Sequence, residues 1–123
     1  MDEVIKSYQD LRVWREAMDL VAAIYVLTKL MPKEELYGLT SQIRRGGVSI
    51  PANIAEGYGR ESRGAYAQHL RIAQGSLKEL ETHLLIVARI DLLPASVIAP
   101  LSLHCEMIGK MLRGLIRAVE PAT

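Results

Sequence analysis

Apolar residues recur along most of the chain at alternating steps of three and four, the spacing of one face of an α-helix. A half-buried strand would need a period of two, which fits these segments poorly. Breakers separate four periodic segments, so we predict helices over residues 10–31, 39–58, 63–90 and 96–119. The clearest stripes are Val13, Ala17, Leu20, Ile24, Leu27 and Met31; Tyr66, Leu70, Ala73, Leu77, Leu80, Leu84 and Val87; and Leu101, Cys105, Ile108, Leu112, Leu115 and Val119.

Residues that suit helix ends flank these segments. Ser7 or Asp10 is expected to cap the first helix, Ser62 the third and Ser96 the fourth, because their side-chain oxygens can accept from free N–H groups. Pro32 is expected to end the first helix. Pro100 is expected to fall in the first turn of the fourth helix, where no N–H partner is needed.

The segment 39–58 is irregular. Leu39, Ile43, Ile50 and Ile54 keep a helical spacing, but Gly46, Gly47 and Pro51 interrupt it. A central proline removes one helical hydrogen bond and crowds the preceding turn. We therefore expect a helix kinked near Pro51, or a break after which Ser49 caps a second half. The two glycines indicate either close helix packing or a bend that places Asn53 and Glu56.

A chain of 123 residues fits one domain. Four helices with short connections predict a single all-α domain over residues 1–123, an antiparallel up-down-up-down four-helix bundle. Further apolar residues lie off the main stripes, which indicates either deep burial or a partner surface, and we favour self-association. These residues are Val21, Tyr25, Ile72, Ile86, Met107, Met111 and Ile116.

Composition adds little to this picture, but the distribution of charge does. The formal net charge is only +1, so no global field attracts nucleic acid or anionic lipid. Residues 40–75, with five arginines and two glutamates, form the only basic third of the chain, at +3. The single cysteine cannot form an internal disulfide, and no transmembrane or signal segment is expected, so we predict a cytoplasmic protein.

The sequence offers little catalytic chemistry, and we predict no enzymatic activity, no cofactor and no metal site. Helical bundles that hold two metals use Glu-x-x-His pairs, and none of the glutamates has a histidine three positions on. The segment 57–62 is similar to a phosphate loop but lacks its preceding strand and third glycine. Cys105 lies on an apolar stripe, where an inert thiol is expected.

Polar residues between positions 42 and 79 are the candidates for function. One interpretation is a structural network in which Glu56 or Glu79 pairs with an arginine and locks the second helix against the third. Its members would be Gln42, Ser49, Asn53, Glu56, Ser76 and Glu79. The other is a strip that faces phosphates, because the arginine fork suits them. Its members would be Arg44, Arg45, Arg60, Arg63 and Arg71. Tyr58 and Tyr66 could stack on bases, although core filling is the stronger expectation.

Several motifs in this region are distinctive. They are Tyr37-Gly-Leu-Thr-Ser-Gln-Ile-Arg-Arg, Ser49-Ile-Pro-Ala-Asn-Ile-Ala-Glu-Gly-Tyr-Gly-Arg60 and Ile72-Ala-Gln-Gly-Ser-Leu-Lys-Glu-Leu-Glu81. Together with Asp10-Leu-Arg-Val-Trp14, they make the chain resemble the bacterial family of four-helix-bundle proteins encoded in intervening sequences of the 23S ribosomal RNA gene, sometimes labelled ribosomal proteins.

The resemblance implies a homopentameric ring without established enzymatic activity. It also extends to the accessory protein of diversity-generating retroelements, which binds nucleic acid and a reverse transcriptase. RNA, or an RNA-associated protein such as a reverse transcriptase, is therefore the implied partner. The near-neutral charge departs from that strongly basic accessory protein, and a module that binds only protein is the alternative. Gly46 and Gly47 stand where the family usually has alanines, which should loosen the second helix.

Overall fold

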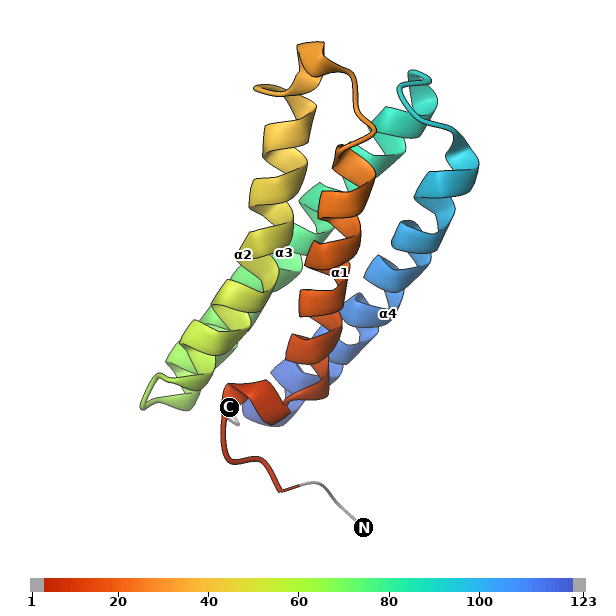
Figure 1. Ribbon diagram of the computed structural model, residues 1–123. Coiled ribbons are helices and arrows are strands. Elements are labelled where there is room, and N and C mark those ends of the chain that lie inside the picture. The colour runs from red at the N-terminus through yellow and green to blue at the C-terminus, as the bar shows by residue number, and fades with distance from the viewer. Residues whose placement is uncertain (1–3, 121–123) are drawn as a thin grey trace.

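Four long helices lie side by side in the computed structural model, which describes residues 4–120 (Figure 1). Their bounds are α1 Arg12–Thr28, α2 Leu39–Tyr58, α3 Arg63–Arg89 and α4 Ala95–Val119. Two short 3-10 helices, η1 Tyr8–Asp10 and η2 Lys33–Glu35, precede α1 and α2. No residue between 4 and 120 lies in a strand.

Successive helices run in opposite directions, and each packs against its two neighbours (Figure 1). The contact between α2 and α3 is the most extensive, and that between α1 and α4 is the least. The Cα atoms of the diagonal pairs α1–α3 and α2–α4 do not come within 8 Å of each other. This is the antiparallel up-down-up-down bundle that the sequence predicts.

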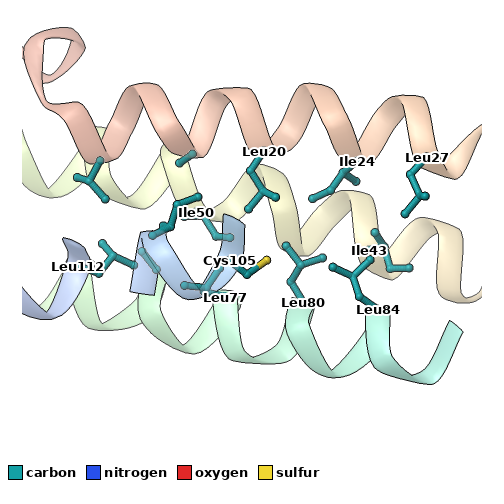
Figure 2. Close-up of a cluster of buried hydrophobic side chains, with 14 of the residues drawn as sticks. Leu20, Ile24, Leu27, Ile43, Ile50, Leu77, Leu80, Leu84, Cys105 and Leu112 are labelled. Atoms are coloured by element: carbon teal, nitrogen blue, oxygen red, sulfur yellow. The ribbon is translucent and has the colours of Figure 1, made fainter. Parts of the chain in front are cut away.

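The predicted stripes form the core between the helices (Figure 2). Leu20 and Ile24 of α1 are fully buried, as are Ile50 of α2, Leu80 of α3 and Leu112 of α4. Burying a side chain of this size stabilises the fold by about 1.5–3 kcal/mol. The three- and four-residue spacing therefore identified the core-facing side of every helix.

The start of the first helix differs from the prediction. Ser7 and Asp10 form a capping box, but they cap η1 rather than α1. The N–H groups of Lys6 and Ser7 donate to the Asp10 carboxylate and lower its pKa. Leu11 occupies the cap position of α1 without a side-chain hydrogen bond.

The remaining helix ends give one confirmation and three corrections. Ser62 caps α3 as predicted, because its hydroxyl accepts from Ala65 N at 3.1 Å. Helix α1 ends at Thr28 rather than Met31. Helix α4 begins at Ala95 after Pro94, so Ser96 is not its cap. Pro100 consequently lies in the second turn, beyond the N–H groups that need no partner.

Helix α2 runs without a break from Leu39 to Tyr58, and its ribbon curves along its length (Figure 1). Pro51 is buried inside it, so the alternative of a break at this point is wrong. The two adjacent glycines have different surroundings. A Cβ on Gly47 would lie 2.8 Å from Ile24 Cδ1, which indicates close packing against α1, whereas one on Gly46 would meet nothing within 4 Å.

Of the apolar residues that lie off the main stripes, some are buried in the core and others are exposed. Ile116 is buried in the core and Met111 packs against it. Tyr25, Ile72 and Ile86 remain 40%, 43% and 37% exposed. Val21 and Met107 are half-buried. Within residues 4–120, no helix is long and apolar enough to cross a membrane.

Candidate functional site

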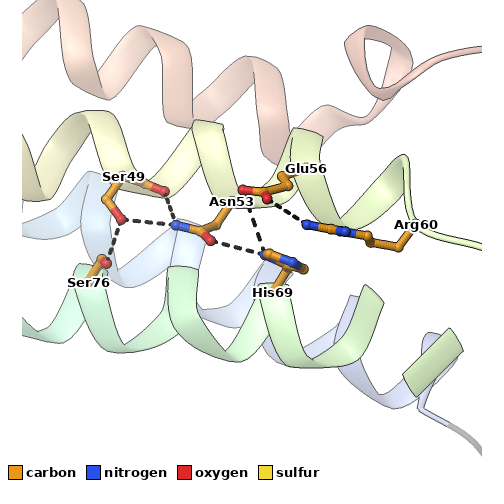
Figure 3. A network of polar contacts seen from close by, with 6 residues as sticks. All are labelled: Ser49, Asn53, Glu56, Arg60, His69 and Ser76. Carbon is orange, nitrogen blue, oxygen red and sulfur yellow. Dashed lines mark hydrogen bonds and ion pairs between the residues drawn. The ribbon is translucent and has the colours of Figure 1, made fainter. Parts of the chain in front are cut away.

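A chain of polar contacts joins α2 to α3 along one edge of their interface (Figure 3). The hydroxyls of Ser49 and Ser76 lie 2.9 Å apart across the interface. Asn53 Nδ2 donates to both the carbonyl and the hydroxyl of Ser49, at 2.9 Å and 3.0 Å. Three residues of the predicted network therefore meet, and they join the two helices.

His69 extends this chain toward the end of α2, and the sequence interpretation missed it. Its Nδ1 lies 3.2 Å from Asn53 Oδ1 and 4.0 Å from Glu56 Oε2. Glu56 also accepts from Arg60 at 2.8 Å. The predicted pairing of Glu56 with an arginine is confirmed, but Glu56 lies in the last turn of α2 and Arg60 just after its end, so this ion pair does not lock two helices together. Asn53 and the two serines make that connection.

The other predicted network members lie outside this chain of contacts. Gln42 and Glu79 line a shallow hollow with Arg45 and Gly46. A Cβ on Gly46 would meet nothing within 4 Å, so the space beside this glycine is open. No hydrogen bond or ion pair joins Glu79 to another residue in the described part of the chain, so of the two glutamates it is Glu56 that holds an arginine there.

The five predicted arginines fall into two groups. Arg44 and Arg45 lie in the first half of α2. Arg44 Nε donates to Thr28 Oγ1 at 2.8 Å, and its guanidinium lies 4.8 Å from the centre of the Tyr25 ring. Arg45 is exposed and makes no hydrogen bond or ion pair with residues 4–120. Both arginines line a second hollow, between α1 and α2, together with Tyr25, Val48 and Ser49.

The second group lies near the other end of the bundle and makes contacts within the chain. Arg63 donates to the carbonyls of Val119 and Ala118 at 2.9 Å and 3.0 Å, and so caps α4. Arg71 pairs with Glu120. The third member, Arg60, holds Glu56 as described above. Each of these three arginines therefore contacts a group at or near the end of a helix of the same chain.

The two groups do not form one continuous strip. Arg45 and the end of α2 at Tyr58 are separated by about 20 Å at 1.5 Å per residue. Tyr58 and Tyr66 stack edge to face with ring centres 6.0 Å apart, which favours core filling over base stacking. Burial raises the pKa of Tyr66 to about 12, with a smaller contribution from Tyr58.

Among residues 4–120, no three His, Cys, Asp or Glu side chains come close enough together to hold a metal. Cys105 is fully buried, and burial, assisted by Glu81, raises the pKa of its thiol to about 12. His104 of α4 lies 2.8 Å from Glu16 of α1, so that pair bridges two helices.

Comparison with known proteins places the chain in a family. The sequence profile of the family described as "23S rRNA-intervening sequence protein" matches residues 9–114. The chain belongs to this family. The fold is also similar to the crystal structure of a protein of unknown function from the S23 ribosomal protein family of Bacteroides thetaiotaomicron. It is 26% identical, with a TM-score of 0.79 over 85% of this chain and 97% of that one. Among curated proteins, none matches the chain.

Proposed function

We propose that the protein is a non-enzymatic oligomeric scaffold of the cytoplasm that binds RNA or an RNA-associated protein. The family's description supplies the link to ribosomal RNA. The resemblance to retroelement accessory proteins adds a reverse transcriptase as a candidate partner. Arg44, Arg45, Arg60, Arg63 and Arg71 remain the candidate contacts to phosphate.

The observation that carries this proposal is the hollow between α1 and α2. It combines two arginines with Tyr25 and Val48, which are 40% and 43% exposed. The fork of an arginine side chain is suited to binding phosphate. Exposed aromatic and apolar side chains are suited to contact with a protein partner. Arg45 is the best candidate for a ligand contact, because it makes no hydrogen bond or ion pair within residues 4–120.

Self-assembly is supported by apolar side chains on the outer faces of several helices. Ile72 of α3 is 43% exposed and Leu103 of α4 is 67% exposed. Met18, on the same side of α1 as Tyr25, is 44% exposed. A ring of five chains would bury part of this surface and would repeat the +3 charge of residues 40–75 around its axis.

A salt-dependent binding assay with a charge-matched control tests the nucleic-acid part. We expect the wild-type oligomer to retain RNA on a filter at low salt and to release it steeply as salt rises, because counterions compete for phosphate. Arg45→Gln should weaken retention several-fold without changing the urea unfolding midpoint. Arg89→Gln removes the same charge from an exposed site at the end of α3 and should leave retention unchanged. Failure of the wild type to retain RNA or DNA contradicts nucleic-acid binding.

The alternative is an interaction module that binds only protein. The intramolecular contacts of Arg44, Arg60, Arg63 and Arg71 favour it, because they give these arginines structural roles. Under this alternative, Arg44→Gln lowers the free energy of unfolding. Substitution of either arginine of the hollow then leaves the retention of nucleic acid unchanged. Oligomers that form normally but never retain RNA would support it.

A further inference from the structure

A separate hollow lies at the corner where α1 passes into α2. It has a volume of about 200 Å³ and lies between the end of α1, the turn η2 and the first turns of α2. Apolar lining comes from Met31, Pro32 and Leu36. The polar lining consists of Thr28, Lys29, Lys33, Thr40 and Arg44.

The charge of this lining has one sign. Lys29, Lys33 and Arg44 contribute three cations, and none of the described residues that line the hollow is acidic. In the described part of the chain neither lysine has a carboxylate within ion-pair distance. Arg44 is held in place through Nε by Thr28, which leaves the ends of its guanidinium for another acceptor. Such a site favours an anion that can accept from several directions.

The backbone adds to this preference. The first N–H groups of a helix have no partner inside it, and the helix dipole favours negative charge at that end. Helix α2 starts after Gly38 without a side-chain cap from that residue. Glu35 Oε1 accepts from Leu39 N at 3.3 Å, so the outermost N–H already attracts one carboxylate.

Thr40 provides an independent indication of a ligand. Thr40 is only 3% exposed, and its hydroxyl oxygen has no hydrogen-bond partner in the described structure. A buried polar group without a partner destabilises the folded chain. A side chain of this kind that lines a cationic hollow is explained if a ligand supplies the missing partner.

We infer that this hollow is a phosphate-binding site. Lys29, Lys33 and Arg44 would neutralise the charge, while Thr40 and the start of α2 would supply hydrogen bonds. The inference goes beyond the proposed function, because a single phosphate group suffices as ligand and no RNA chain is required. A free phosphorylated small molecule and the phosphorylated end of a nucleic acid present the same chemistry.

Titration of the full chain with inorganic phosphate at constant ionic strength tests the site. Two-dimensional amide NMR spectra should show saturable shifts at Leu39, Thr40 and Ser41, with a dissociation constant on the order of 1 mM. Thr40→Val and Lys33→Gln should each weaken binding about fivefold to tenfold. Arg89→Gln removes one positive charge at the end of α3, outside this hollow, and should bind phosphate as the wild type does.

Thr40→Val also separates binding from folding. Its hydroxyl has no partner to lose, so the urea unfolding midpoint should be unchanged or higher. Absence of saturable shifts in the wild type, or a wild-type dissociation constant in either variant, overturns the inference. The RNA assay compares Arg45→Gln with the wild type, whereas this assay compares Thr40→Val and Lys33→Gln, so failure of one proposal is distinguishable from failure of the other.

Two RNA oligonucleotides of the same sequence identify the source of the phosphate. Tighter binding of the 5′-phosphorylated form than of the 5′-hydroxyl form, lost in Thr40→Val, assigns the site to nucleic-acid ends. Equal binding of the two forms, with inorganic phosphate still bound, assigns it to a small phosphorylated molecule. Both results uphold the phosphate site.

Discussion

Single residues decide how closely the helices approach one another, and two glycines of α2 illustrate opposite cases. A Cβ on Gly57 would lie 2.7 Å from His69 Cβ and 3.1 Å from Tyr66 Cδ1. The same atom on Gly46 would lie in open space. From the sequence both positions look alike, because glycine in a helix indicates either close packing or a bend. Only the neighbouring helix distinguishes them.

Alanine at these two positions should therefore have opposite effects on stability. Gly57→Ala forces α2 away from the backbone-proximal atoms of α3 and should lower the free energy of unfolding by about 1–3 kcal/mol. Gly46→Ala gains helix propensity and should raise it by about 0.5–1 kcal/mol. Urea denaturation measures both. Equal effects of the two substitutions would contradict the close contact at Gly57.

Burial of Cys105 predicts an inert thiol. At pH 8 a thiol with the ordinary pKa of 9.0 is partly ionised, whereas one with a pKa of about 12 is about a thousandfold less so. A thiol-specific reagent should modify the native chain at least 100-fold more slowly than the urea-unfolded chain. Complete modification in urea, at the single cysteine, is the control. Rapid modification of the native chain would show that the core at Cys105 is open.

At the scale of elements, the sequence predicted which segments are helices and which faces are buried. Periodic apolar residues report these properties directly, since both depend on spacing within one segment. It did not predict cross-helix partners, such as Asn53 with His69 or Arg44 with Thr28. Those depend on the register of two helices, which the packing of many side chains sets together. For the same reason, the phosphate site at the α1–α2 corner has no motif in the sequence.

The register of α2 against α3 gives a prediction for Asn53. Asn53→Ala leaves Ser49 without its amide donor and His69 without its oxygen partner, so it should lower the free energy of unfolding by about 1–3 kcal/mol. Gln42 lies three turns earlier on a similar face of α2 and is exposed. Gln42→Ala should therefore change the free energy of unfolding by less than about 0.5 kcal/mol. Thermal or urea unfolding compares them. Asn53→Ala as stable as Gln42→Ala would mean that the polar chain contributes nothing.

At the scale of the whole molecule, the bundle is complete as a monomer but exposes apolar side chains on several helices. Its core needs no second chain, because the predicted stripes bury one another. Tyr25, Val48, Ile72 and Leu103 remain at least 40% exposed, and they are the candidates for the proposed contact between chains. The sequence could predict that the helices carry more apolar residues than the stripes that face the core require. It could not predict which of them the bundle would absorb, and Ile116 proved to be one.

Assembly is thus the central claim, and the molar mass in solution tests it most directly. Multi-angle light scattering at micromolar concentration should give a multiple of the chain mass of 13.7 kDa, and about five times that value for the ring. The mass should persist on moderate dilution and at raised salt, because apolar burial depends little on ionic strength. A mass of 13.7 kDa under these conditions would contradict the account.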